Sequence, residues 1–333
     1  MTSSPHQILV VGVGSIGERH VRCFQATRRA QVSICDSDKT QLRAVADRYD
    51  IRNAFNGFDE ALNNKFDAVV IATPAHLHIP MAIQAAKANC HLLIEKPLSV
   101  NLSGVNELLT IITEMQRIAM VAYVMRSHPA LAAMRNAIQS GRFGEPLHLY
   151  ATSGQHFPTY RPAYRDIYYR DRATGGGAIQ DALTHVINAA EWLVGPVDRL
   201  VADAEHQVLQ GVDVEDTVNV LARHGRVLAS YAYNQHQAPN ELTITVVCKR
   251  GTARFEYHET RWSWMEKPDT PWQHESLAGF ERDTIFVRQA EAFLDALDGK
   301  QLPPCTVSDA ARTLKVNLAI IQSSEDKSNW VQL

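Results

Sequence analysis

Between residues 7 and 123, short apolar runs alternate with segments in which apolar residues recur every three or four positions. The runs are almost continuously apolar, which is typical of strands buried on both faces of a parallel sheet. The segments between them have the period of amphipathic helices. The predicted strands are residues 8–13, 32–36, 66–73, 91–95 and 118–124, and the predicted helices are residues 39–49, 79–89 and 103–116.

The pattern changes after residue 129. A predicted helix ends at Gly141, a glycine suited to close a helix, and a strand follows at residues 147–154. Four strand-like runs then come with only short turns between them, which indicates a mostly antiparallel sheet. Two helices end the chain, and Ser308 is a candidate N-cap for the second. The runs are residues 217–223, 226–233, 241–248 and 252–258, and the helices are residues 284–299 and 308–325.

These two patterns predict an α/β protein with two domains. Residues 1–125 are expected to form a doubly wound parallel sheet. Residues 126–333 are expected to form an α+β domain with a large, mostly antiparallel open sheet. A chain of 333 residues is also longer than a single hydrophobic core usually supports.

Composition and charge exclude several classes of function. The 33 basic and 36 acidic residues give a net charge of −3, so no overall field draws the chain to nucleic acid or to a membrane. The five cysteines are scattered and never spaced as C-x-x-C, which indicates neither a disulfide framework nor a zinc site. The N-terminal apolar run has the pattern of neither a signal peptide nor a membrane span. We expect a cytoplasmic protein with a small-molecule partner and no bound metal.

A glycine motif follows the first predicted strand. Gly12, Gly14 and Gly17 form G-x-G-x-x-G at the start of a helix, the context in which this motif binds the pyrophosphate of a dinucleotide. Asp36 ends the second strand, 19 residues after Gly17, where a carboxylate would bind the ribose hydroxyls and repel a 2′-phosphate. NAD is therefore preferred over NADP, although Lys39 could still reach a 2′-phosphate. Alternatively, the glycines form a plain turn and Asp36 only caps it.

Four segments together resemble a known family. They are GVGSIGERH at residues 12–20, TPAHLH at residues 73–78, EKP at residues 95–97 and GGGAIQDALTHVINAAEWLVGP at residues 175–196. The chain resembles the Gfo/Idh/MocA oxidoreductases, which include glucose-fructose oxidoreductase and inositol dehydrogenase. This resemblance implies an N-terminal Rossmann domain, a C-terminal domain for substrate binding and oligomerisation, and a homodimer or homotetramer.

The resemblance, the glycine motif and the composition of the chain together give the candidate site residues, and the catalytic ones are implied by the resemblance. The catalytic candidates are Lys96, Asp181 and His185. The cofactor-binding candidates are Gly12, Gly14, Ser15, Ile16, Gly17, Asp36, Thr73, Pro74, His78, Glu95 and Lys96. The substrate-binding candidates are Lys96, Tyr123, Arg126, Tyr164, Asp181 and His185. The chain departs from the family at Ala75, where many members have asparagine, and at Asn188, where many have aspartate. These departures weaken any transfer of substrate identity.

Oxidation of an alcohol needs a general base for the hydroxyl proton while hydride leaves for the nicotinamide. Lys96 and His185 could each be that base, and burial beside a nicotinamide cation would favour a neutral lysine. Asp181 lies four residues before His185 on a predicted helix, so both side chains share one face. Alternatively, Lys96 only pairs with Glu95 at the surface, and Asp181 and His185 only stabilise their helix.

The stretch of residues 156–177 is rich in tyrosine and arginine and is predicted to be a functional loop. Its side chains would suit stacking on a sugar ring, or alternatively a subunit interface or a packed loop. The sequence therefore predicts an NAD(P)-dependent dehydrogenase that acts on CH–OH groups of a sugar, sugar acid or cyclic polyol. The alternatives are an NAD-dependent glycosidase that oxidises its substrate transiently and a nonenzymatic NAD-binding regulator.

Overall fold

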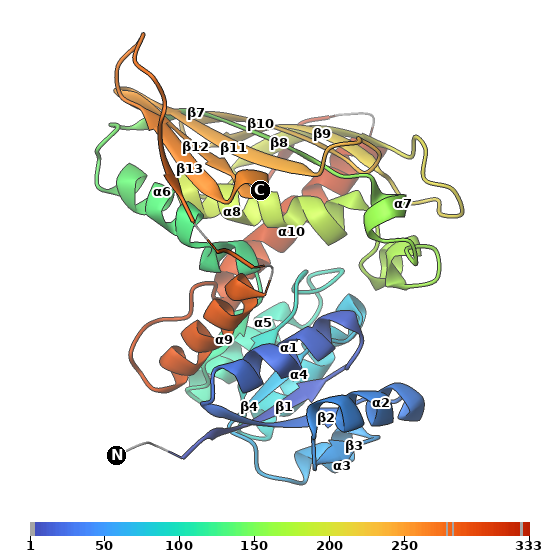
Figure 1. Ribbon diagram of the computed structural model, residues 1–333. Coiled ribbons are helices and arrows are strands. Elements are labelled where there is room, and N and C mark those ends of the chain that lie inside the picture. The colour runs from blue at the N-terminus through green and yellow to red at the C-terminus, as the bar shows by residue number, and fades with distance from the viewer. Residues whose placement is uncertain (1–3, 278, 282, 327–328) are drawn as a thin grey trace. The chain divides into compact units, whose positions relative to one another are not determined.

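The computed structural model describes residues 4–277, 279–281, 283–326 and 329–333. Two compact units make up the chain (Figure 1). The first unit comprises Met1–Ser127 and Glu281–Ala311, and the second comprises His128–Phe280 and Arg312–Leu333. Each unit is built around its own β-sheet.

The first unit holds a six-stranded sheet with the order β3-β2-β1-β4-β5-β6, and each of its strand pairs is parallel. This is the strand order of a Rossmann fold, so the predicted doubly wound sheet is confirmed. Its strands are β1 His6–Val11, β2 Ala30–Cys35, β3 Ala54–Phe55, β4 Ala68–Ile71, β5 His91–Ile94 and β6 Ala119–Val121. Its helices are α1 Ser15–Ala26, α2 Lys39–Tyr49, α3 Phe58–Leu62, α4 His78–Lys87, α5 Val105–Glu114 and α9 Thr284–Leu297.

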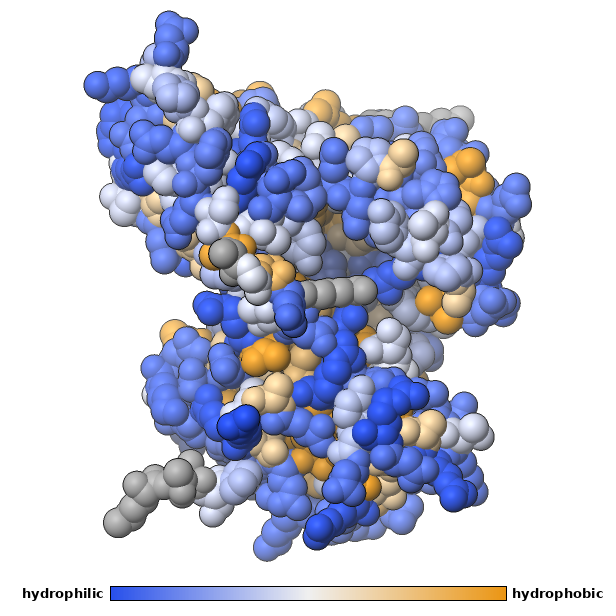
Figure 2. Space-filling view, in the orientation of Figure 1, coloured by the Kyte–Doolittle hydropathy of each residue, from blue (hydrophilic) through white to orange (hydrophobic). Residues whose placement is uncertain are grey.

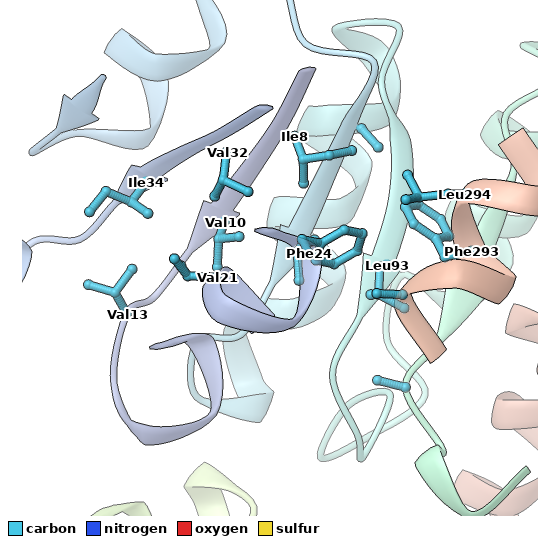
Figure 3. Packing of buried hydrophobic residues seen from close by; sticks show 14 of the residues in the cluster. Ile8, Val10, Val13, Val21, Phe24, Val32, Ile34, Leu93, Phe293 and Leu294 are labelled. Carbon is cyan, nitrogen blue, oxygen red and sulfur yellow. The ribbon is translucent and has the colours of Figure 1, made fainter. Parts of the chain in front are cut away.

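The core of the first unit includes a helix from far along the chain. Phe293 and Leu294 of α9 are fully buried in the same cluster as Val10 of β1 and Phe24 of α1 (Figure 3). The rings of Phe24 and Phe293 meet edge to face, with their centroids 6.3 Å apart. Residues 281–311 thus belong to the first compact unit, whereas the sequence analysis assigned them to the second domain. The sequence analysis placed one boundary between residues 125 and 126, and one boundary cannot describe a unit that is made of two separate segments of the chain.

The second unit contains a nine-stranded sheet with the order β14-β13-β12-β11-β7-β10-β9-β8-β15. Only the β7–β10 pair is parallel among the described strand pairs, which confirms the predicted mostly antiparallel sheet. Its strands are β7 Pro146–Gly154, β8 Arg199–Glu205, β9 Thr217–His224, β10 Val227–Asn234, β11 Glu241–Cys248, β12 Gly251–Glu256, β13 Arg261–Met265, β14 Gln273–Ser276 and β15 Val331–Gln332.

Helices α6 Pro129–Gln139, α8 Thr184–Val194 and α10 Val307–Glu325 lie along one face of this sheet (Figure 1). Side chains alternate along β9, where Val218, Val220 and Ala222 are buried. Leu221 on the same strand and Leu228 on β10 are about half exposed. The sheet therefore has a covered face and an open face, as expected for an antiparallel sheet in an α+β domain.

Two buried hydrogen bonds join α8 to α10. Asn188 donates to the Thr313 hydroxyl at 2.9 Å, and Asn317 donates to the Thr184 hydroxyl at 2.8 Å. The partners are four residues apart on each helix, so the bonds lie on successive turns. This pairing fixes the rotation of α8 about its own axis. Asn188, a departure from the family pattern, thus has a packing role within the second unit.

Hydrophilic side chains cover most of the face seen in Figure 2, with apolar side chains scattered among them. All five cysteines are buried thiols. Across the described ranges, no helix combines the length and the apolar character that crossing a membrane requires. Within those same ranges, His, Cys, Asp and Glu side chains form no group of three or more suited to a metal ion.

Asp298, the C-cap of α9, connects this helix to the start of the first unit. Its carboxylate accepts hydrogen bonds from Lys300 at 2.8 Å and Arg29 at 2.9 Å, and it lies 2.9 Å from Nε2 of His6. The Lys300 bond is the largest influence on the pKa of Asp298. With His6 and Arg29 it outweighs partial burial and lowers that pKa to about 2.

Replacing Asp298 with asparagine is expected to lower the free energy of unfolding at neutral pH by about 1 kcal/mol, a modest value because solvent screens the pair. A carboxyl whose pKa is lower in the folded protein than in the unfolded chain stabilises the fold at a pH above the unfolded value of about 3.9. This contribution is lost as the pH falls toward the folded pKa of about 2. Urea unfolding should therefore show a weaker loss of stability between about pH 4 and pH 2 in Asp298→Asn than in the parent. Asp47→Asn, at a well-exposed position, is the control, and identical pH profiles for Asp298→Asn and the parent would contradict the assignment.

Candidate active site

The turn between β1 and α1 requires glycine at two positions. Gly12 has a φ of +82°, and a Cβ there would lie 2.7 Å from the Ala72 carbonyl oxygen of the neighbouring strand end. A Cβ on Gly17 would lie 1.7 Å from the Gly12 carbonyl oxygen. Gly14 differs, because no side chain or backbone from elsewhere in the fold lies within 4 Å of its Cβ position. The turn is therefore tightly packed at Gly12 and Gly17 and open at Gly14.

The amino end of α1 faces this open space. Its N-cap is Gly14, which provides no side-chain cap. The N–H groups of the first turn, on Ser15, Ile16 and Gly17, therefore rely on solvent or a ligand for hydrogen bonds. Together with the helix dipole they form a site that favours a phosphate group. The turn thus fits the pyrophosphate of a dinucleotide.

Asp36 stands directly after β2, beside the same turn. One carboxylate oxygen accepts the Val13 N–H at 2.7 Å and the other accepts the Asp38 N–H at 2.8 Å. These bonds hold the carboxylate in place, and each oxygen can accept a further hydrogen bond. The arrangement fits the two hydroxyls of an adenosine ribose. Asp36 thus does more than cap a turn, because it anchors the glycine loop itself.

Replacing Asp36 with asparagine is expected to reduce the preference for NAD over NADP by roughly tenfold or more, since the charge that repels a 2′-phosphate is lost. Fluorescence titration with each dinucleotide measures both dissociation constants. Asp38→Asn is the matched control, because the Asp38 carboxylate caps α2 instead. An unchanged ratio in Asp36→Asn would show that this carboxylate does not face the ribose.

The segment after β4 lies next to the glycine turn. The Thr73 nitrogen is 3.0 Å from the position of a Cβ on Gly12. Its hydroxyl contacts the Met81 sulfur at 3.6 Å. Pro74 is exposed and precedes a short 3-10 helix, Ala75–Leu77. His78 begins α4 and is buried, with each ring nitrogen against a main-chain carbonyl oxygen.

Glu95 and Lys96 follow β5. The Glu95 carboxylate is buried and contacts Nε2 of His20 on α1 at 2.7 Å, while its other oxygen accepts the Lys96 N–H at 3.0 Å. Burial opposes ionisation of Glu95, but His20 and Lys96 outweigh it, so the pKa of Glu95 lies below its ordinary value. The Lys96–Pro97 peptide bond is cis, and Lys96 is half-buried. Glu95 is therefore a buried partner of His20, not the surface partner of Lys96.

Tyr123 and Arg126 follow β6 in the first unit. Tyr123 is almost fully buried. The Arg126 guanidinium, also buried, donates to the Pro304 carbonyl at 2.9 Å and to the Asp309 carboxylate at 3.3 Å. The Arg126 guanidinium thus contacts residues 281–311, the later segment of the first unit.

Asp181 and His185 lie in the second unit. Residues Ile179–Leu183 form a π-helical turn that continues into α8, so the predicted α-helix begins with a wider turn. Positions 181 and 185 are still close to one full turn apart. Asp181 is buried and accepts the Tyr168 hydroxyl at 2.7 Å, and His185 is half-buried. A π-turn of this kind is frequent at functional sites.

Tyr164 lies inside the loop that the sequence analysis singled out. Its ring packs on Phe157 and Tyr169, and its hydroxyl donates to the Gln210 carbonyl at 2.8 Å. Only about 1% of its surface is exposed. Tyr164 thus belongs to a small local core, whereas the neighbouring Tyr168 reaches Asp181.

All of the predicted cofactor residues lie in segments that follow strands of the first sheet. Strands β1, β2, β4, β5 and β6 run in parallel, so the residues that follow them meet at one edge of the sheet. Those residues are Gly12, Gly14, Ser15, Ile16, Gly17, Asp36, Thr73, Pro74, His78, Glu95, Lys96, Tyr123 and Arg126. Asp181 and His185 form a second group in the other unit. His20 and Tyr168 are the contacts that sequence reasoning did not assign.

The strand order, the glycine turn and the Asp36 carboxylate define a dinucleotide-binding protein. Residues 6–123 match the family model described as an oxidoreductase family with an NAD-binding Rossmann fold, and residues 131–254 match the GFO/IDH/MocA C-terminal domain. The chain belongs to the Gfo/Idh/MocA family of oxidoreductases. The predicted family, the oxidoreductase class and NAD as the cofactor are thereby confirmed.

The chain is similar in sequence to several known oxidoreductases. An uncharacterised oxidoreductase of Rhizobium meliloti is 27% identical and covers 90% of each chain. The levoglucosan dehydrogenase of Pseudarthrobacter phenanthrenivorans is 26% identical over 74% of this chain and 73% of the relative. Among solved structures, a levoglucosan dehydrogenase in complex with NADH and levoglucosan has a TM-score of 0.90 at 22% identity and covers 99% of each chain. The last comparison supports the fold.

Proposed function

We propose that this protein is an NAD-dependent dehydrogenase that transfers a hydride between nicotinamide and a carbinol carbon of a sugar, sugar acid or cyclic polyol. The observation that carries the proposal is the position of Lys96. It follows β5 at the sheet edge that also bears the glycine turn, and the buried Glu95 fixes its main chain. An amine held there suits proton exchange with a substrate hydroxyl beside the cofactor.

The names of relatives support this class of substrate. They include levoglucosan dehydrogenase, the inositol 2-dehydrogenase of Rubrobacter xylanophilus and the D-glucoside 3-dehydrogenase of Escherichia coli. Each name contains a sugar or a polyol. The inositol and glucoside enzymes match only 51% and 56% of their own length, so they support the class of substrate and not its identity.

NAD, when bound, accepts or returns the hydride. In this proposal the glycine turn and the first turn of α1 hold the pyrophosphate, and Asp36 holds the adenosine ribose. Thr73 and Pro74 lie beside the turn and would border the rest of the dinucleotide. The first unit is thus the cofactor domain, and the second unit is the substrate domain.

The proton transfer is assigned to Lys96 and His185, either of which can be the immediate base. Lys96 in its ammonium form would polarise a carbonyl when the reaction runs in reverse. Asp181 would orient the His185 ring or accept a hydrogen bond from an adjacent sugar hydroxyl. The Tyr168 hydroxyl holds one oxygen of Asp181, which limits the rotation of that carboxylate.

A panel of polyols, sugars and sugar acids, monitored at the NADH absorbance band with NAD and with NADP, tests the reaction. We expect substrate-dependent NADH formation for at least one class and a weaker response with NADP. If the protein binds NAD by titration but reduces it with no member of a broad panel, the proposal is wrong. Release of an aglycone without net NADH would also contradict it.

The proposal includes assembly into a homodimer or homotetramer and a location in the cytoplasm. Leu221 and Leu228 expose 56% and 49% of their surface on adjacent strands of the open sheet face, where a second subunit could cover them. Light scattering tests the assembly, and a monomeric mass would contradict it. Cell fractionation tests the location.

A further inference from the structure

One buried side chain links the two segments of the first unit that the proposed function assigns to NAD and to proton transfer. In His78, Nδ1 lies 2.9 Å from the Pro97 carbonyl oxygen and Nε2 lies 2.8 Å from the Thr73 carbonyl oxygen. Only about 1% of the residue is exposed. We propose that His78 is a positioning residue that locks the Lys96 segment to the Thr73 segment and does not itself touch the cofactor. The inference rests on the proposed dehydrogenase function.

The chemistry of the two contacts supports this assignment. A carbonyl oxygen only accepts hydrogen bonds, so each contact is a hydrogen bond only where the ring nitrogen in it carries a proton. A neutral ring donates to one carbonyl, and a protonated ring donates to both. Burial is the largest influence and lowers the pKa of His78, whereas the two carbonyls and Glu95 act in the opposite direction. In either form both nitrogens face the protein's own main chain, so neither points to a ligand.

On the Lys96 side, buried groups hold the main chain before and after the lysine. Glu95 accepts the Lys96 N–H and is itself held by His20 of α1. The carbonyl of the next residue, Pro97, contacts His78 of α4. Two helices thus fix the short segment from which the amine projects. Loss of the His78 contact would free one side of that segment and displace the amine.

On the Thr73 side, the same ring holds the carbonyl of a residue that packs against the glycine turn. The Thr73 nitrogen lies 3.0 Å from the Cβ position of Gly12. A shift of Thr73 would therefore alter the wall of the proposed pyrophosphate site. His78 couples the position of the cofactor to the position of the amine, and hydride transfer is sensitive to displacements of about 1 Å.

Two substitutions separate the contacts. Counted in bonds from Cα, the amide nitrogen of asparagine matches Nδ1 of histidine, and that of glutamine matches Nε2. His78→Asn thus keeps a donor toward Pro97, and His78→Gln keeps a donor toward Thr73. We expect His78→Gln to lose roughly 10- to 100-fold in kcat with the Kd for NAD within about twofold of the parent. We expect His78→Asn to keep kcat and to raise the Kd for NAD by about tenfold.

His76→Asn and His76→Gln are matched controls, because His76 is exposed on the 3-10 helix that directly precedes His78, and neither should change kcat or Kd. Thermal unfolding of all four variants checks that they fold. Equal effects of the two His78 variants, or changes confined to the unfolding temperature, would overturn the inference. If the parent oxidises no substrate, the proposed function fails, and the NAD titrations alone still test the Thr73 contact.

Discussion

Replacing Lys96 with methionine is expected to reduce turnover by roughly a thousandfold or more while leaving NAD affinity within about threefold of the parent. Methionine has a similar length and no amine, so it can neither take nor return the substrate proton. The hydrogen bond from position 96 to Glu95 uses the main-chain N–H and survives the substitution. The segment therefore stays in place, and the loss reports on the amine. Steady-state kinetics and fluorescence titration with NAD measure the two quantities.

Lys87→Met is the matched control for this prediction. Lys87 ends α4 in the same unit, is well exposed and pairs only with the exposed Glu107 at 3.2 Å among the contacts described for it. Surface pairs of this kind contribute about 0–1 kcal/mol, so the control should retain both turnover and stability. A Lys96→Met protein with more than about a tenth of the parent kcat would remove Lys96 from the mechanism.

Replacing His185 with alanine is expected to lower kcat by about a hundredfold to ten-thousandfold, the range for loss of a general acid–base group. The affinity for NAD should remain unchanged, because the glycine turn and Asp36 belong to the other unit. This combination distinguishes a residue that acts on substrate from one that supports the cofactor domain. Kinetics over a range of substrate concentrations and NAD titration provide the measurement.

His148→Ala is the control for His185, since His148 is an exposed residue of β7 in the same unit. It should behave as the parent in both assays. If His185→Ala instead lost NAD binding and left kcat intact, the proposed division of roles between the units would be wrong. If both catalytic substitutions were neutral, the proposed substrate site would lie elsewhere.

The fold could be predicted where burial leaves a strong pattern in the sequence. The runs at residues 8–11 and 92–94 are apolar because β1 and β5 are covered on both faces. The two-residue β3 has no such pattern, since it only extends the edge of the sheet. Strand β14 was also missed, and it is exposed along its whole length. Short or exposed strands take their conformation from their neighbours.

The site could be predicted to a similar extent. Gly12, Gly17 and Asp36 are recognisable because the turn tolerates few other residues at those positions. The partner of Glu95 could not be found, because His20 lies 75 residues away in the sequence and meets it only in the folded unit. Tyr168 likewise reaches Asp181 from a loop 13 residues away. Contacts of this kind depend on tertiary structure, and no local spacing signals them.

The packing of α9 in the core of the first unit has a consequence for folding during translation. The chain passes from one unit to the other after Ser127, Phe280 and Ala311. Phe24 therefore emerges from the ribosome long before Phe293, its partner in the core. Domains near an N-terminus usually complete folding during synthesis. The core of the first unit is here completed only after strands β7 to β14 of the second sheet have been translated, because α9 follows them in the chain.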